Sequence, residues 1–340
     1  MTSRELVKQT MEFQNTNGRA PRDLWCLDWA SIYYEKELAE IRKNYPNDYA
    51  GVHTVYKQES AVENGHPTEI GTYVDAWGCV FKNIQRGVIG EVKQPIITDD
   101  EWKDLSRVVI PEEWLSFDVE QVNEEYRKSD KWITCGCCPR PFEQLQFLRG
   151  TVDLYMDLMD PPKGFLDFLE KMHDFYCCLL RKWAQTEVDS LNFMDDWGSQ
   201  RSLLISPALW RRYFKPMYQD YIEIAHSAGK KISMHSDGYT LDIIPDLIDM
   251  GLDALNTQIF CIGLDKLKPF KGKITFWGEI CRQNLLPYGT VADVEKAVTD
   301  VFETLWDNGG CIAQCEFGAG AKPENVEAVF RTWDRLTAGR

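Results

Sequence analysis

Short apolar strands alternate with helices through the second half of this 340-residue chain. The clearest helix has Ser206 as its N-cap and ends at Gly229, and the apolar segment 231–235 follows at once. A capping box over residues 290–293 opens another helix, which leads to the apolar segment 311–315. Strands joined through crossover helices pair in parallel. The second half therefore predicts a parallel sheet covered by helices.

Eight segments of the chain are predicted as strands. They are residues 24–28, 76–82, 131–135, 189–195, 231–235, 254–258, 274–279 and 311–315. Eight parallel strands fit an α/β protein of the (β/α)8 TIM barrel class, whose active site lies at the carboxyl ends of the strands. An open doubly wound sheet is the alternative, although no predicted strand is followed by a Gly-x-Gly-x-x-Gly turn.

Residues 31–130 are more than one strand–helix unit of a barrel requires. The stretches 71–78 and 87–95 are rich in glycine and β-forming residues, which is typical of hairpins. We therefore expect an N-terminal elaboration near the barrel mouth. The chain has no internal repeat, low-complexity segment or flexible linker, and this favours a single barrel domain over residues 1–340.

Composition limits the partners and the compartment. With 44% hydrophobic residues the chain can form a large core, and no run approaches the roughly 20 apolar residues of a membrane span. The first residues lack the features of a secretory signal, so the eleven cysteines indicate a reducing cytoplasm. A net charge of -15 opposes contact with phosphate backbones. We expect neither a nucleic acid nor a membrane as a partner. The composition is compatible with a homodimer.

Imidazole, carboxylate and thiol side chains end three of the predicted strands. These candidate metal ligands are His235, Asp237, Glu279, Cys281 and Cys315. Residues two apart on a strand leave it on the same side, and the carboxyl ends of barrel strands share one rim. This mixture of nitrogen, oxygen and sulfur ligands suits zinc. Each residue also has a structural alternative, since a buried cysteine, a turn at 236–238 and a hydrogen-bonded histidine are all common.

Further candidates lie at the ends of other strands. Asp195 and Asp196 precede Trp197, and either carboxylate could bind substrate, orient a metal ligand or transfer a proton. The alternative is that they cap the following turn. The Cys-x-Cys-Cys pattern at 135–138 lacks a second pair of cysteines and favours packing near the pocket. Several tryptophans near strand ends, among them Trp25, predict a pocket for a flat aromatic or macrocyclic ligand.

From about residue 19 to residue 333 the chain resembles the uroporphyrinogen decarboxylase superfamily, a set of (β/α)8 barrels. The resemblance is carried by Arg19-Ala-Pro-Arg-Asp-Leu-Trp25, Leu148-Arg-Gly150, Asp157-Leu-Met-Asp-Pro-Pro162, Asp195-Asp-Trp-Gly198, His235-Ser-Asp-Gly238 and Gly278-Glu-Ile-Cys-Arg-Gln283. The superfamily includes the decarboxylases themselves and the zinc-dependent methyltransferases that act with corrinoid proteins. These motifs are specific for the superfamily and less specific for its branches.

Comparison with the two branches favours the methyltransferases. The decarboxylases carry an arginine-rich stretch after the first strand, whereas residues 26–31 contain no arginine and place Asp28 there. The methyltransferases hold zinc through His-x-Cys near the fifth strand and a cysteine near the eighth. His235 and Cys315 match the outer two ligands, and Asp237 replaces the middle cysteine. The resemblance thus implies one of three arrangements. Zinc is bound by His235, Asp237 and Cys315, or it is bound by His235, Cys281 and Cys315 with Glu279 or Glu316 nearby, or the site holds no metal.

The resemblance implies a zinc-dependent methyltransferase that demethylates a methoxylated small molecule. The chain has no obvious corrinoid-binding segment, so a partner corrinoid protein would supply the methyl acceptor. Asp195 or Asp196 would fix the substrate or protonate the leaving oxygen. The alternative is a metal-free decarboxylase of a uroporphyrinogen-like or small aromatic acid, in which Asp28 or Asp195 protonates the ring. A non-catalytic docking partner for a corrinoid protein is a third hypothesis.

Overall fold

A curled parallel sheet forms the centre of the molecule in the computed structural model, which describes residues 1–337. Six strands pair in the order β1-β11-β10-β9-β8-β7, all in parallel. Their bounds are β1 Arg22–Cys26, β7 Ser190–Met194, β8 Lys231–Ser236, β9 Ala254–Thr257, β10 Thr275–Gly278 and β11 Cys311–Phe317. These six correspond to predicted strands, and the α/β class with a parallel sheet is confirmed.

Two shorter strands lie between the edges of this sheet. β2 (Tyr49–Ala50) and β6 (Trp132–Ile133) pair with each other in parallel. The Asp48 amide donates to the Arg22 carbonyl of β1 at 2.8 Å, and the Asp189 amide, next to β7, donates to Ile133 at 2.9 Å. The observed architecture is therefore a curled half-barrel extended by two short strands. Pairings this short do not establish the complete (β/α)8 barrel that the sequence predicts.

The prediction of a parallel strand at 76–82 is wrong. β4 (Val80–Asn83) instead pairs antiparallel with β3 (Gly71–Val74) and β5 (Glu91–Val92) in a separate sheet. A turn within the predicted strand causes this, because the Asp75 carboxylate accepts hydrogen bonds from the Trp77 and Cys79 amides. The expected hairpins within residues 31–130 are thus present.

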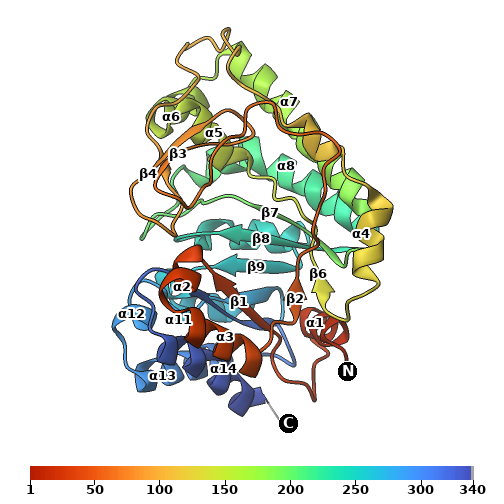
Figure 1. The fold of residues 1–340 in the computed structure, drawn as a ribbon, viewed down its shortest axis with the longest axis vertical. Coiled ribbons are helices and arrows are strands. Elements are labelled where there is room, and N and C mark those ends of the chain that lie inside the picture. Colours follow the sequence, from red (N-terminus) through yellow and green to blue (C-terminus); the bar gives the residue numbers. More distant parts are fainter. Residues whose placement is uncertain (338–340) are drawn as a thin grey trace.

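Helices cover the outer face of the curled sheet. Their bounds are α1 Ser3–Met11, α2 Asp28–Tyr33, α3 Glu35–Asn44, α4 Val119–Tyr126, α5 Pro141–Arg149, α6 Thr151–Met159, α7 Lys163–Ala184, α8 Pro207–Ser227, α9 Ile244–Asp249, α10 Ile259–Ile262, α11 Leu264–Leu267, α12 Leu285–Tyr288, α13 Val291–Leu305 and α14 Pro323–Thr337, with short 3-10 turns at Glu112–Leu115, Leu241–Ile243 and Lys268–Phe270. Figure 1 shows α7 and α8 beside β7 and β8, and α3, α13 and α14 at the opposite side. The predicted caps are confirmed at Ser206 and at the Thr290–Asp293 capping box.

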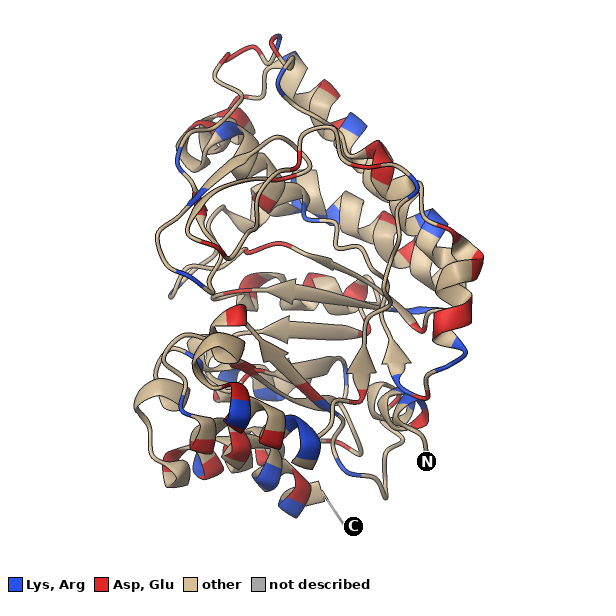
Figure 2. Ribbon diagram, viewed as in Figure 1, with Lys and Arg blue, Asp and Glu red and all other residues tan. Residues whose placement is uncertain are grey.

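An apolar cluster closes one end of the curled sheet. Val7 and Met11 of α1 pack there with Trp132 and Ile312, together with Tyr49, Ala254 and Trp277. Most of these residues start their strands, so α1 covers the amino ends and leaves the carboxyl ends free for a site. Figure 2 shows that charged residues lie mainly on helices and loops, with both signs interspersed. No helix within residues 1–337 combines the length and the apolar character that crossing a bilayer requires.

Candidate active site

Two adjoining cavities lie inside the curled sheet, one above the apolar cluster that includes Tyr49 and Trp277 and the other at the carboxyl ends of the strands. The smaller has a volume of about 530 Å³ and the larger about 1420 Å³. His235 at the end of β8 lines both, as do Thr134, Cys138, Asn192 and Met194. A side chain at this position can therefore act on a ligand in either cavity.

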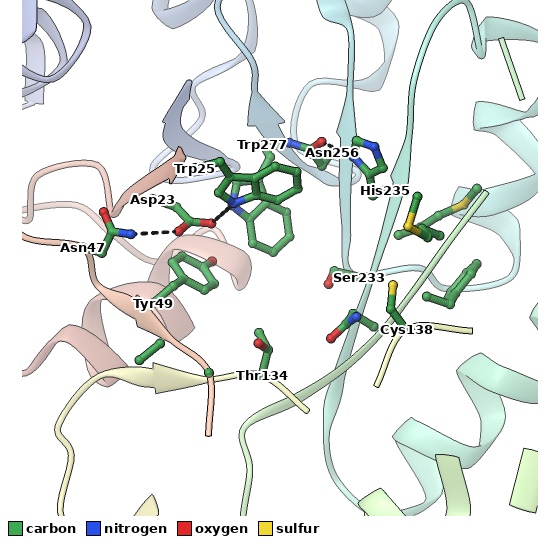
Figure 3. Close-up of a pocket in the computed structure, with 16 residues that line it drawn as sticks. Asp23, Trp25, Asn47, Tyr49, Thr134, Cys138, Ser233, His235, Asn256 and Trp277 are labelled. Carbon is green, nitrogen blue, oxygen red and sulfur yellow. Dashed lines mark hydrogen bonds between the residues drawn. The ribbon is translucent and has the colours of Figure 1, made fainter. Parts of the chain in front are cut away.

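Two indoles and a buried carboxylate form one wall of the smaller cavity (Figure 3). Asp23 and Trp25 leave β1 on the same side because they are two residues apart. The Asp23 carboxylate accepts hydrogen bonds from Trp25 Nε1 at 2.7 Å and Trp277 Nε1 at 3.1 Å, and its other oxygen accepts one from Asn47 at 3.3 Å. Burial raises the pKa of Asp23 to about 7. Asp23 thus holds both indoles in place and titrates near neutral pH.

Asp23 predicts an unusual dependence of stability on pH. The carboxyl titrates near 3.8 when unfolded and near 7 when folded, so between these values the folded state binds more protons and stability falls as the pH rises. We expect Asp23→Asn to remove this contribution, which is at most roughly 4 kcal/mol. Urea unfolding of both proteins from pH 4 to pH 8 measures it. A difference between wild type and variant that stays constant over this range contradicts the prediction.

His235 is oriented by the neighbouring strand. Its Nδ1 lies 2.6 Å from Oδ1 of Asn256, its register partner on β9. An amide oxygen only accepts hydrogen bonds, so Nδ1 carries a proton, and in the neutral imidazole Nε2 has the lone pair. The Trp25 ring packs against the imidazole at a centroid distance of 5.4 Å. The lone pair of Nε2 is thereby presented to the residues that follow β7 and β8.

Two aspartates lie at this nitrogen. Oδ1 of Asp196 and Oδ1 of Asp237 are each 3.6 Å from His235 Nε2. Burial, followed by the charge of Asp237, raises the pKa of Asp196. Asp237 Oδ1 is buried without a hydrogen-bond partner. Among residues 1–337, the ligand atoms of Asp196, His235 and Asp237 form one of two groups in which three or more candidate metal-binding atoms lie within 4.8 Å of one another.

Crossing loops bring the two aspartates together. The Gly198 amide donates to the Asp237 carbonyl at 3.0 Å, and the Asp237 amide donates to Asp196 Oδ1 at 2.9 Å. A Cβ on Gly198 would lie 2.1 Å from the Tyr239 nitrogen, and one on Gly238 would lie 2.0 Å from the Gly198 carbonyl oxygen. Only glycine at both positions permits this approach, so the backbone of the loops fixes the separation of the carboxylates.

An arginine that the sequence reasoning did not single out lies at the same place. Arg282 forms an ion pair with Asp237, and its guanidinium also reaches Glu316 at 3.2 Å and Glu279 at 3.5 Å. Burial raises the pKa of Glu279 to about 7 and also raises the pKa of Glu316. Acidic groups outnumber this one guanidinium, so the site attracts cations more readily than polycarboxylates.

The structure brings only part of the predicted ligand set together. Cys315 is fully buried and lies on the face of β11 opposite to Glu316, within the core beneath the helices. Cys281 lines a separate cavity of about 170 Å³ with Cys261 and Glu279. Neither thiol belongs to the group at His235.

Two predicted catalytic residues lie away from the cavities. Asp195 is fully buried, accepts hydrogen bonds from Tyr218 and from the Glu143 amide, and has a pKa raised by burial. Asp28 is exposed and accepts a hydrogen bond from Thr68 at 2.6 Å. Asp196 lines the larger cavity.

The hydrogen bond that His235 donates to Asn256 gives a direct prediction. Replacing Asn256 by alanine removes the acceptor that fixes the imidazole, and we expect a loss of roughly 10–100-fold in affinity for a metal at His235. Asn256→Asp keeps an acceptor and is expected to retain most of the affinity. Titration with zinc and a competing chelator measures both variants. Equal affinities for the alanine variant and the wild type contradict the assigned role.

Comparison with known proteins places these residues in context. Residues 65–336 match the family model of uroporphyrinogen decarboxylase (URO-D). Among solved structures, the chain is similar to a methyltransferase from Methanosarcina mazei, with a TM-score of 0.66 and 16% identity over 99% of this chain and 100% of that one. A D-psicose 3-epimerase structure in the presence of D-fructose aligns with a TM-score of 0.42 and 8% identity, over 65% and 84% of the two chains. No curated protein matches.

Proposed function

Because this chain belongs to the uroporphyrinogen decarboxylase family, we propose that it is a zinc-dependent methyltransferase that works with a corrinoid protein and demethylates a methoxylated aromatic compound. The observation that carries the proposal is the convergence of His235, Asp196 and Asp237 beside a cavity walled by two indoles. The fold shared with a methyltransferase is consistent with it.

The residues at His235 fit a zinc ion. A ligating histidine usually donates its second ring nitrogen to an oxygen acceptor, as His235 does to Asn256. Oδ1 of Asp237, which has no hydrogen-bond partner, would join Oδ1 of Asp196 and His235 Nε2 in a set of nitrogen and oxygen ligands. Zinc held by these residues would supply a Lewis acid for an ether oxygen, and carboxylate ligands would leave it more electrophilic than thiolate ligands would.

The smaller cavity supports an aromatic substrate. Trp25, Trp277 and Tyr49 offer apolar rings, and the hydrogen bonds that both indoles donate to Asp23 keep them from rotating. A planar ring stacked there would lie next to His235, which lines the same cavity. In the proposed reaction a cobalt(I) corrinoid would supply the electron pair for the new bond to the methyl group, the methyl–oxygen bond would break, and the aryl oxygen would keep the bonding pair.

The larger cavity supports delivery of the acceptor by a partner. Its walls combine strand ends with Tyr73, Phe81 and Val92 of the small antiparallel sheet. Three exposed isoleucines, Ile70, Ile84 and Ile89, adjoin the same strands. A cavity of about 1420 Å³ that adjoins the proposed substrate cavity is suited to a macrocycle presented by another protein.

A decarboxylase is the second candidate, and Asp23 is the observation that favours it. Asp28 and Asp195 lie away from the cavities, whereas Asp23 lines the smaller cavity with a pKa near 7. A carboxyl group that keeps its proton at neutral pH could protonate an electron-rich ring as carbon dioxide leaves. This reaction would need no metal.

The two functions are separated by one reconstitution. The zinc-loaded protein is mixed with a methoxybenzoate and with cobalamin reduced to the cobalt(I) state, and the absorbance change on methylation of cobalt is followed. We expect methylation that a chelator abolishes and added zinc restores. Release of carbon dioxide without cobalt methylation would overturn the proposal in favour of the decarboxylase. Tight association with a corrinoid protein without either reaction would indicate a docking protein.

A further inference from the structure

A second group of candidate metal ligands lies on the outer surface, away from the two cavities. His173 and Cys177 are four residues apart on α7 and therefore share one helix face. Asp220 lies opposite them on α8, which packs against α7 (Figure 1). The ligand atoms of these three residues lie within 4.8 Å of one another. Two long helices thus hold an imidazole, a thiol and a carboxylate together.

The distances within this group suit a metal more than a nucleophile. His173 Nε2 is 2.8 Å from Asp220 Oδ2, and Cys177 Sγ is 3.6 Å from Nε2 and 3.7 Å from Nδ1. A thiol activated by histidine would point at one ring nitrogen, whereas this sulfur lies at nearly the same distance from both. Bonds of roughly 2.0–2.3 Å to zinc place tetrahedral ligand atoms about 3.3–3.8 Å apart. The observed separations are within a small side-chain movement of that geometry.

Exposure and charge also favour a cation. The Cys177 thiol is buried and the His173 imidazole is partly exposed. The Asp220 side chain is 51% exposed, so an ion can reach the group from solvent on the side of this carboxylate. Asp220 and Glu223 line a surface cavity of about 480 Å³ beside the group, and Arg181 is the one basic residue, among residues 1–337, that lines it with them.

We propose that His173, Cys177 and Asp220 form a second metal site, which takes a borderline divalent ion of the zinc class and joins α7 to α8. Water would complete the coordination. Nitrogen, oxygen and sulfur ligands together select such ions over magnesium and calcium, which prefer oxygen alone. This site is independent of the proposed methyltransferase function and does not share a residue with it.

Cobalt(II) distinguishes the two sites, because only the outer one contains a thiolate. Full-length protein is titrated with cobalt(II), and the near-ultraviolet absorption of thiolate-bound cobalt is recorded together with the number of bound ions. We expect the band in the wild type and in His235→Ala, and its loss in Cys177→Ser and His173→Ala. The matched control is His226→Ala, since His226 pairs with Asp253 at 2.8 Å without a ligand thiol. That control should keep the band.

Asp220→Asn tests the site without disturbing the core, because the side chain is half exposed. We expect at least a tenfold loss of cobalt affinity with unchanged thermal unfolding of the metal-free protein. Absence of the band in the wild type, or its persistence in Cys177→Ser, would overturn the proposal. Equal affinity in His173→Ala, Asp220→Asn and wild type would also overturn it. Loss of one bound ion in His235→Ala reports only on the site at the strand ends.

Discussion

Replacement of His235 by alanine is expected to remove one equivalent of zinc per chain and to lower the rate of cobalt methylation by at least ~10³-fold. The imidazole is the one nitrogen donor in the group with Asp196 and Asp237, and two carboxylates alone hold zinc weakly. Lewis-acid stabilisation of a leaving oxygen contributes several kcal/mol, and about 4 kcal/mol corresponds to three orders of magnitude in rate. Metal analysis after dialysis and the cobalamin assay measure the two effects.

The control for this substitution is again His226→Ala, which removes an imidazole paired with a carboxylate on the outer surface. It should keep the full metal content and rate. The proposal for the site fails if His235→Ala retains the wild-type zinc content, or if it loses zinc but methylates cobalt at the wild-type rate. Unfolding of His235→Ala without added metal should resemble that of the metal-free wild type, since the imidazole is partly exposed.

The order of strands was largely predictable because the parallel strands are apolar runs followed by helices with clear caps. The helices before β8 and β11 have clear N-caps at Ser206 and Thr290. Both strands lie within one or two residues of their predicted bounds. β2 could not be found, because its two residues carry no periodicity. The apolar segment at 76–82 took its place in the count, although the Asp75 turn makes it part of a hairpin.

The site was predictable where a polar residue marks the inner face of a strand. His235 and Asp237 were expected to share one side as ligands, whereas Asp196 was predicted with Asp195 as a catalytic candidate and was not in the predicted ligand set; all three lie together. Cys315 shows the limit of this reasoning. A parallel strand covered on both faces is apolar on both, so the sequence does not reveal which alternate residues face inward. In β11 the inward side carries Glu316, and Cys315 faces the helices.

Two residues that the sequence reasoning missed had weak signals. Asp23 immediately precedes the predicted strand at 24–28 and belongs to the observed β1, where a buried carboxylate needs donors, which the two indoles supply. Arg282 follows a glutamate and a cysteine in a loop, where nothing in the sequence indicates that it reaches Asp237 and Glu316. Contacts between loops of different strands depend on the whole fold and are not encoded in local spacing.

Replacement of Gly238 by alanine is expected to destabilise the protein by roughly 2–5 kcal/mol and to abolish metal binding at His235. The residue has φ of 77°, which is strained for any side chain, and the added Cβ would lie 2.0 Å from the Gly198 carbonyl oxygen. The clash is with backbone, so the two loops must separate. Since the same crossing holds Asp196 beside Asp237, the carboxylates would separate as well. Urea unfolding and zinc titration measure both effects.

Other glycines of the chain serve as matched controls, which separate the strain of positive φ from the steric clash of the added Cβ. Gly229 also has positive φ, 69°, but nothing lies within 4 Å of its added Cβ, so Gly229→Ala should cost only about 1 kcal/mol and keep zinc affinity. Gly198→Ala meets backbone at 2.1 Å without positive φ and isolates the collision. We expect it to lose zinc as Gly238→Ala does, whereas Gly51→Ala, in open space, should be neutral. Wild-type zinc affinity in both Gly198→Ala and Gly238→Ala would mean that the loop crossing does not position the carboxylates.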